Sequence, residues 1–230
     1  MTSPQLPLAV GLRPERGFGD FVWQQSIDLL PFLKNLAAGR ETQGYVHGLP
    51  GTGKSHLLEA TVDAAEQQGR RACLLSANML IDLPPEALDG MEHFDLVAID
   101  DIDKLADQPA WQEAIFHLYN RVRLNSGSLL FSASAAPQQS GITLKDLQSR
   151  LGAGAVFALT PLDDAGLTQF LYQQAASRGL SLGDELARYL VMRAPRQPAA
   201  LAAIMQQLDQ ASLADQRRLT IPFVRQQLGW

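Results

Sequence analysis

The run Gly48-Leu49-Pro50-Gly51-Thr52-Gly53-Lys54-Ser55 has the spacing GxxxxGK[ST]. Glycines let backbone N–H groups wrap a polyphosphate, and the N-terminus of a following helix adds favourable partial charge. Lys54 is expected to reach the β- and γ-phosphates, and Ser55 is expected to ligate Mg²⁺. The predicted nucleotide-binding residues of this loop are Gly48, Pro50, Gly51, Thr52, Gly53, Lys54, Ser55 and His56.

Two carboxylates, Asp100 and Asp101, follow the apolar run 96–99. At a strand end beside a phosphate loop, one carboxylate can hold Mg²⁺ and a second can orient the attacking water. We therefore assign Asp100 to the metal and Asp101 to catalysis through the water. Asp103 is expected to be a solvated surface charge.

The elements that must position these groups are short apolar strands alternating with amphipathic helices. Strands are expected at 45–47, 72–75, 96–99, 128–132 and 156–159, with helices over 54–67, around 111–122 and from a cap at Thr143 to Leu151. This β-α repetition predicts an α/β fold with a doubly wound, five-stranded parallel sheet.

Beyond Thr160-Pro161 only helical patterns occur. We expect an extended tail at 1–12, an α/β nucleotide-binding subdomain at 13–160 and a helical subdomain at 161–230. Ligands of such sheets bind outside the carboxyl ends of the strands, so the helical subdomain could close over the ligand. An apolar surface on it would support a homodimer.

The composition, with 230 residues, 46% hydrophobic content and a net charge of −5, indicates a globular protein. No apolar run approaches the roughly 18 to 20 residues that cross a bilayer, and the N-terminus lacks a signal-peptide pattern, so we expect a cytoplasmic protein without membrane contact. The absence of a long basic block argues against sequence-independent DNA binding. Cys73 lies in an apolar run and is expected to be a core thiol.

The order of these parts, with a polar residue ending the fourth strand and Ser149-Arg150-Leu151 closing the next helix, resembles the DnaA-related group of the AAA+ superfamily. The resemblance implies a P-loop NTPase fold with a C-terminal helical lid. In that group this arginine is a finger that reaches the γ-phosphate of ATP on a neighbouring subunit. Arg150 is therefore expected to act catalytically in trans.

Three further stretches, 90–94, 114–121 and 219–224, resemble the regulatory members of that group, so the likeness covers nearly the whole chain. It implies that Gln5, Leu6 and Leu8 dock on the DNA polymerase III sliding clamp and that DnaA is a partner. It also implies a negative regulator of replication initiation that stimulates ATP hydrolysis by DnaA. The chain ends after the lobe, so no direct sequence-specific DNA binding is expected.

The resemblance also implies residues around the nucleotide. Phe21 and Val22 match the segment that packs against adenine. Ser134 stands at the sensor position of the fourth strand, where relatives commonly have Asp, and Ala199 stands where a sensor arginine is usual. Either Arg196 replaces that arginine or the contact is missing. We therefore expect ADP or ATP as a structural ligand and weak or absent hydrolysis by this chain.

Two other functions stay open on the residues alone. A DnaC-like helicase loader or stand-alone ATPase would use the same loop and acidic pair for its own turnover. A small-molecule P-loop kinase would need an acceptor pocket and a basic lid, and the acidic pair and the alanine-rich stretch 199–211 argue against it.

Overall fold

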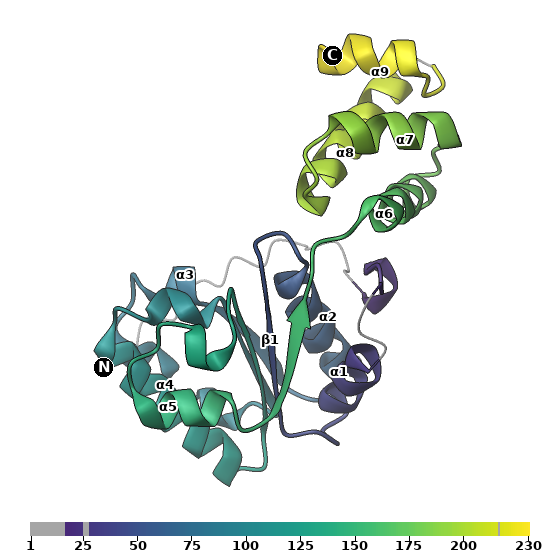
Figure 1. Cartoon of the computed structure of the whole chain (residues 1–230). Coiled ribbons are helices and arrows are strands. Elements are labelled where there is room, and N and C mark those ends of the chain that lie inside the picture. The colour runs from purple at the N-terminus through teal and green to yellow at the C-terminus, as the bar shows by residue number, and fades with distance from the viewer. Residues whose placement is uncertain (1–16, 25–27, 216) are drawn as a thin grey trace, which may run out of the picture.

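A computed structural model describes residues 17–24, 28–215 and 217–230, which form an α/β subdomain and a helical subdomain beside it (Figure 1). The five strands form one sheet in the order β2-β3-β4-β1-β5, and every pair is parallel. The predicted five-stranded parallel sheet is confirmed. Its strands are β1 (Gln43–Gly48), β2 (Ala72–Ser76), β3 (Leu96–Asp100), β4 (Ser128–Ala133) and β5 (Ala155–Leu159).

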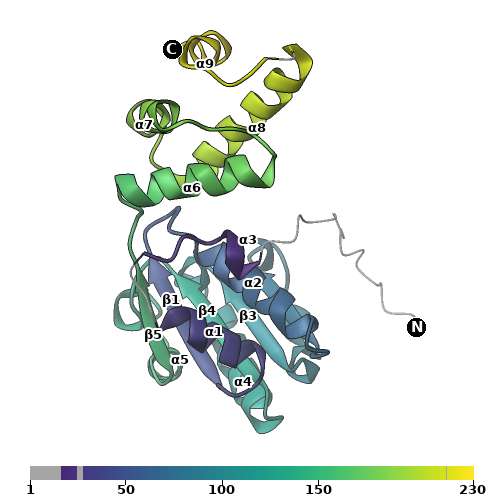
Figure 2. The same cartoon turned by 90° about the vertical axis from the view of Figure 1, so that its right-hand side faces the viewer.

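Helices cover both faces of the sheet (Figure 2). One face packs on α1 and α2, and the other packs on α4, α5 and the short segments near them. These helices are α1 (Leu29–Ala37), α2 (Lys54–Glu66), α3 (Ala77–Leu80), α4 (Pro109–Leu124) and α5 (Lys145–Leu151). The 3₁₀ turns are η1 (Phe18–Asp20), η2 (Pro85–Leu88), η3 (Met91–His93), η4 (Ile102–Leu105) and η5 (Pro137–Gln139).

Strand β3 illustrates why the central strands are apolar throughout. Its successive side chains point to opposite faces, so Val97 and Ile99 enter the core beneath α4, whereas Leu96 and Ala98 enter the core beneath α2. All four are fully buried. Burial on both faces fits an interior strand of a parallel sheet, and β3 lies between β2 and β4. Its last residue, Asp100, reaches the functional edge.

The helical subdomain has its own apolar core and follows β5 after a short connection. Its helices are α6 (Asp164–Ser177), α7 (Asp184–Arg193), α8 (Pro198–Asp215) and α9 (Ile221–Leu228). Asp163 caps α6, because its side chain accepts a hydrogen bond from the N–H of Gly166 at 2.9 Å. In the described part of the chain, no helix is long and apolar enough to cross a membrane.

The predicted cap at Thr143 is wrong. Helix α5 begins at Lys145, and its N-cap residue is Leu144, whose side chain makes no capping hydrogen bond. The buried Gln112 of α4 takes that place, since its Oε1 accepts from the N–H groups of Thr143 and Leu144 at 3.0 and 2.9 Å. A side chain distant in sequence therefore holds the segment that leads into α5, where the local pattern predicted a cap by Thr143.

Cys73 is half-buried against the core beneath α4. Burial, followed by the nearby charge of Glu66, raises the pKa of its thiol to about 12. The thiol is consequently protonated at neutral pH, as expected for a packing residue.

Candidate functional site

The phosphate loop joins β1 to α2, and its glycines have steric reasons to be glycine. Gly51 and Gly53 have φ values of 82° and 94°, in the left-handed region. A Cβ on Gly48 would lie 2.4 Å from the carbonyl oxygen of Leu159 on the neighbouring strand. The loop can therefore form this curve only with small residues at these positions.

Lys54 is 7% exposed and lies inside the curve of the loop. Its Nζ donates to the carbonyl oxygens of Gly48 at 2.8 Å and Leu49 at 3.4 Å. Thr52 donates to the same Leu49 carbonyl at 2.9 Å, whereas Ser55 is exposed in the first turn of α2. The ammonium, a hydroxyl and the N-terminus of α2 thus meet at one edge of the sheet.

His47 and His56 flank this loop. Burial, followed by the charge of Lys54, lowers the pKa of His47, which keeps its ring neutral at physiological pH. The Nε2 of His56 lies 3.1 Å from the carbonyl oxygen of Gly17, and its ring lies 6.0 Å from that of Phe21. His56 therefore joins α2 to the N-terminal segment that borders the loop.

The acidic pair lies at the end of β3, beside β4. The Asp100 carboxylate accepts a hydrogen bond from the buried Ser132, whose Oγ in turn accepts the N–H of Asp101 at 2.8 Å. The Asp101 carboxylate forms an ion pair with Lys104 at 2.9 Å. The two carboxylates consequently have different partners, although they are neighbours in sequence.

Asp103 is not the solvated charge that the sequence suggested. Its carboxylate accepts hydrogen bonds from the N–H of Ser134, at 3.1 Å, and from the Ser134 hydroxyl. The turn of η4 brings Asp103 back towards the end of β4, a proximity that local sequence spacing does not reveal. A carboxylate therefore reaches the sensor position although the residue there is serine.

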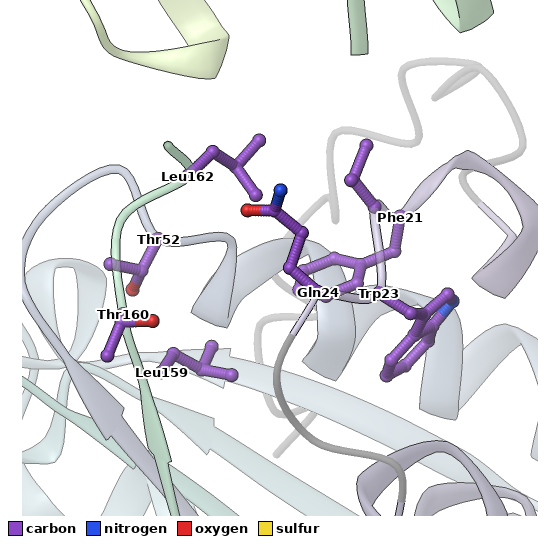
Figure 3. Close-up of a pocket in the computed structure, with 8 residues that line it drawn as sticks. Phe21, Trp23, Gln24, Thr52, Leu159, Thr160 and Leu162 are labelled. Atoms are coloured by element: carbon purple, nitrogen blue, oxygen red, sulfur yellow. The ribbon is translucent and has the colours of Figure 1, made fainter. Parts of the chain in front are cut away.

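Phe21 and Val22 border a small pocket that also contacts the phosphate loop (Figure 3). The pocket opens between the N-terminal segment, Thr52 of the loop and the connection between the two subdomains. Its lining residues are Phe21, Val22, Trp23, Gln24, Thr52, Leu159, Thr160 and Leu162. Val22 is buried and Phe21 is partly buried, so their side chains form an apolar wall next to polar backbone.

Gln24 ties this wall to the helical subdomain. Its Nε2 donates to Asp163 Oδ1 at 2.7 Å, and its Oε1 accepts from the N–H of Asp163 at 3.4 Å. A Cβ on Gly166 would lie 2.4 Å from the Gln24 amide carbon, so α6 accommodates this side chain only because a glycine faces it. The pocket therefore has two walls that are bonded to each other.

The helical subdomain also approaches the phosphate loop directly. The Cγ of Gln197 lies 3.5 Å from the position that a Cβ on Gly51 would take. Arg196 instead forms an ion pair with Asp164 at 2.5 Å, and Ala199 is exposed in the first turn of α8. Gln197, which the sequence did not single out, is thus the residue of this segment that lies against the loop.

Arg150 lies at the opposite end of β1 from the phosphate loop. Its carbonyl oxygen accepts a hydrogen bond from Nε2 of Gln43, the first residue of β1, at 2.6 Å. Gly48, at the other end of β1, is five residue steps away, or about 17 Å at about 3.3 Å per residue. The structure therefore brings the loop, acidic pair and pocket together but separates Arg150 from them.

Sequence reasoning missed Ser132, Gln24 and Gln197. Ser132 carried a usable signal, because a serine within an otherwise apolar strand must satisfy its hydroxyl when it is buried. Gln24 and Gln197 lie in irregular segments without a pattern that predicts their contacts. The tail residues Gln5, Leu6 and Leu8 lie outside the described residues.

Comparison with known proteins agrees with the fold. Residues 33–158 match the family of the bacterial DnaA ATPase domain, and residues 163–228 match the Hda lid domain. Domain III of the replication initiation protein DnaA from Thermotoga maritima superposes with a TM-score of 0.82 at 19% identity, covering 94% of this chain and 97% of that one.

Two further structures have the same fold. AMPPCP-bound DnaA from Aquifex aeolicus gives a TM-score of 0.75 at 21% identity, covering 87% of this chain and 67% of that one. The Holliday junction branch migration motor RuvB from Thermotoga maritima gives a TM-score of 0.71 at 17% identity, covering 95% of this chain and 72% of that one.

The parallel sheet, the glycine-rich loop and the helical lid define an AAA+ P-loop protein. The chain belongs to the bacterial DnaA ATPase domain family, and its lid is of the Hda type.

Proposed function

We propose that this protein is a negative regulator of replication initiation that stimulates ATP hydrolysis by DnaA. In this proposal Arg150 acts as an arginine finger on the ATP of a DnaA subunit. A cation placed beside the transferring phosphate offsets the charge that develops in the transition state. The family match makes this a DnaA-related protein. The resemblance of the stretches 90–94, 114–121 and 219–224 to regulatory members of that group supports the regulatory role.

The observation that carries the proposal is the separation between Arg150 and the chain's own phosphate loop. One arginine side chain cannot span a strand of about 17 Å. Arg150 is exposed at the end of α5, so a nucleotide on another subunit can reach it. Any role of Arg150 in hydrolysis is consequently a role in trans.

We further propose that ADP or ATP, with Mg²⁺, binds at the phosphate loop and the adjoining pocket. The loop fits a polyphosphate, because Gly51 and Gly53 give it a curve that glycine adopts without strain and Lys54 lies within that curve. Phe21 and Val22 would pack against the adenine. Ser55 and Asp100 would hold Mg²⁺, a hard cation that prefers oxygen ligands and that would neutralise phosphate charge when bound.

The same site favours a structural role for the nucleotide over turnover by this chain. Asp101, the residue expected to orient water, is engaged in an ion pair with Lys104. Arg196 is paired with Asp164 and Ala199 offers no charge, so neither supplies a sensor cation to the phosphates. A ligand that binds only the folded state still stabilises it, whether or not it is hydrolysed.

The tail supplies the third part of the proposal. Gln5, Leu6 and Leu8 would dock on the DNA polymerase III sliding clamp as an extended peptide, with the leucines as apolar anchors. The described part of the chain begins at Gly17, whose carbonyl oxygen lies 3.1 Å from His56 Nε2. Clamp on DNA would then bring the regulator to DnaA.

The decisive experiment follows phosphate release from ATP-bound DnaA in the presence of clamp loaded on DNA. Wild-type protein is expected to stimulate release, and Arg150→Ala is expected to reduce the stimulated rate by about 10³-fold or more, the scale of an arginine finger. Arg123→Ala is the matched control, because Arg123 lies on α4 and donates to Gly127 O at 3.4 Å. Equal rates for wild type and Arg150→Ala would overturn the proposal.

A further inference from the structure

The guanidinium of Arg150 lies over an aromatic ring. Its Cζ is 5.6 Å from the ring centroid of Tyr119, within the range of a cation–π contact. Tyr119 belongs to α4 and is 6% exposed, so the ring is fixed by the core around it. Stacking uses the face of a guanidinium and leaves its edge, which carries the N–H donors, directed elsewhere.

Gln43 holds both partners of this contact. Its Oε1 accepts the Tyr119 hydroxyl at 2.7 Å, and its Nε2 donates to the carbonyl oxygens of Arg150 at 2.6 Å and Leu151 at 3.2 Å. The side chain is 5% exposed, and its amide therefore has few alternatives to these partners. One glutamine thus fixes the ring and the end of the helix that carries Arg150.

Gly154 leaves room for this arrangement. A Cβ there would lie 2.9 Å from Gln43 Cγ and 2.6 Å from the Gln43 carbonyl oxygen. The turn between α5 and β5 therefore requires a glycine at position 154, where it passes Gln43.

The C-terminal end of α4, close to Tyr119, is anchored as well. Arg121 forms an ion pair with Glu92 at 3.3 Å, and the side-chain amide of Asn125 donates to the Glu92 carbonyl oxygen at 3.0 Å. These contacts join the stretches 90–94 and 114–121, which the sequence analysis noted without a physical role. They restrain the helix that presents Tyr119.

We infer that Tyr119 and Gln43 are positioning residues that hold Arg150 oriented for the nucleotide of a partner subunit. The inference rests on the proposed trans action of Arg150. An exposed arginine samples many rotamers, and catalysis by a charge depends on having that charge in place before the reaction. The ring restrains the guanidinium from one side, while Gln43 restrains the backbone from which it extends.

The test compares variants of the full chain in the clamp and DnaA assay, measured over a range of regulator concentrations. Tyr119→Leu and Gln43→Ala are expected to lower the maximal stimulated rate by roughly 2-fold to 30-fold, the range that a cation–π contact corresponds to. The concentration for half-maximal stimulation should stay unchanged, because docking does not depend on the ring. Tyr119→Phe keeps the ring and should recover most of the rate.

Val122→Ala is the control for stability, since Val122 is buried on the same helix and lies outside the Arg150 contact. If Val122→Ala lowers the rate as much as Tyr119→Leu at equal loss of melting temperature, the inference is wrong. If Arg150→Ala abolishes stimulation and Tyr119→Leu does not change it, only the inference fails. If Arg150→Ala has no effect, the proposed function fails and the inference falls with it.

A measurement without DnaA covers the case in which Tyr119→Leu folds poorly. A guanidinium over a ring face gives an upfield shift of the Arg150 Hε resonance in a proton–nitrogen spectrum. Tyr119→Phe should retain the shift, and Gln43→Ala should reduce it. An Arg150 Hε at the position of a free arginine in the wild-type protein would overturn the inference.

Discussion

The ring of Phe21 lies against Gly53 of the phosphate loop, so close that a Cβ on Gly53 would be 2.6 Å from the Phe21 Cε2. The apolar wall of the pocket and the turn that binds phosphate are therefore in direct contact. A substitution of Phe21 or Gly53 should therefore affect both the apolar wall and the phosphate-binding turn.

Gly53→Ala tests this contact. The substitution meets Phe21 and also places an L-residue at a φ of 94°, a strain of about 1–3 kcal/mol. We expect a lower melting temperature together with loss of ADP binding, measured by titration calorimetry. Gly69→Ala is the matched control, because its φ is 76° with no atom near the added Cβ, and it should cost stability without changing ADP affinity.

Lys54→Ala tests the phosphate loop itself. Wild-type protein with ADP and Mg²⁺ at 100 times the dissociation constant should gain about 2.7 kcal/mol of unfolding free energy. The variant should gain almost none, because the loop loses its ammonium. Thermal unfolding with and without ADP measures the difference, and the exposed Lys34→Ala serves as the control. A nucleotide-dependent gain that survives in Lys54→Ala contradicts the site.

Gln24→Ala tests the bond between the N-terminal segment and the lid. The variant loses both hydrogen bonds to Asp163. ADP binding should weaken by roughly threefold to tenfold, which corresponds to about 1 kcal/mol of net hydrogen-bond free energy. Gln68→Ala is the control and should leave ADP binding unchanged, because the Gln68 amide donates only locally, to Ala64 O of α2 at 2.8 Å. An unaltered affinity in Gln24→Ala would show that the two walls act independently.

Glu92 predicts a pH dependence of stability. Its own backbone N–H, and then the charge of Arg121, lower the pKa of this carboxyl below the ordinary value of 4.5. A depressed folded-state pKa contributes stability that is present above the ordinary pKa and is lost as pH falls through the folded value. Glu92→Gln should therefore flatten the decline of melting temperature below about pH 4.5.

Glu86→Gln, at an exposed carboxylate of the nearby η2, provides the comparison for the acid titration. It should leave the slope of melting temperature against pH as in the wild type. Parallel acid profiles for Glu92→Gln and the wild type would remove Glu92 as a source of the dependence.

The sequence predicted the fold well, because its apolar runs and its glycine-rich loop are clear signals of strands and of the turn between β1 and α2. Continuous apolar runs such as 96–99 belong to strands buried on both faces, and the glycine-rich loop identifies the strand and helix that flank it. Strand order did not follow from the pattern, since alternation alone does not say which strands are neighbours. Only the structure places β1 between β4 and β5.

Contacts made by side chains across long sequence distances were the part that the sequence could not supply. Asp103 reaches Ser134, and Gln112 bonds the segment before α5, through packing that no local period encodes. The same applies to Gln24 and Asp163, which are 139 residues apart. Local patterns locate strands and loops, whereas these hydrogen bonds depend on how helices and strands pack against each other in three dimensions.

Arg150 and the phosphate loop occupy the two ends of one strand, and this has a consequence for assembly. In the proposed contact, the face that donates the guanidinium is not the face that receives it. Such pairing runs head to tail and has a direction, unlike the self-complementary face of a two-fold dimer. If Arg150 acts on DnaA as proposed, this protein contacts DnaA through the end of β1 that lies opposite its own phosphate loop.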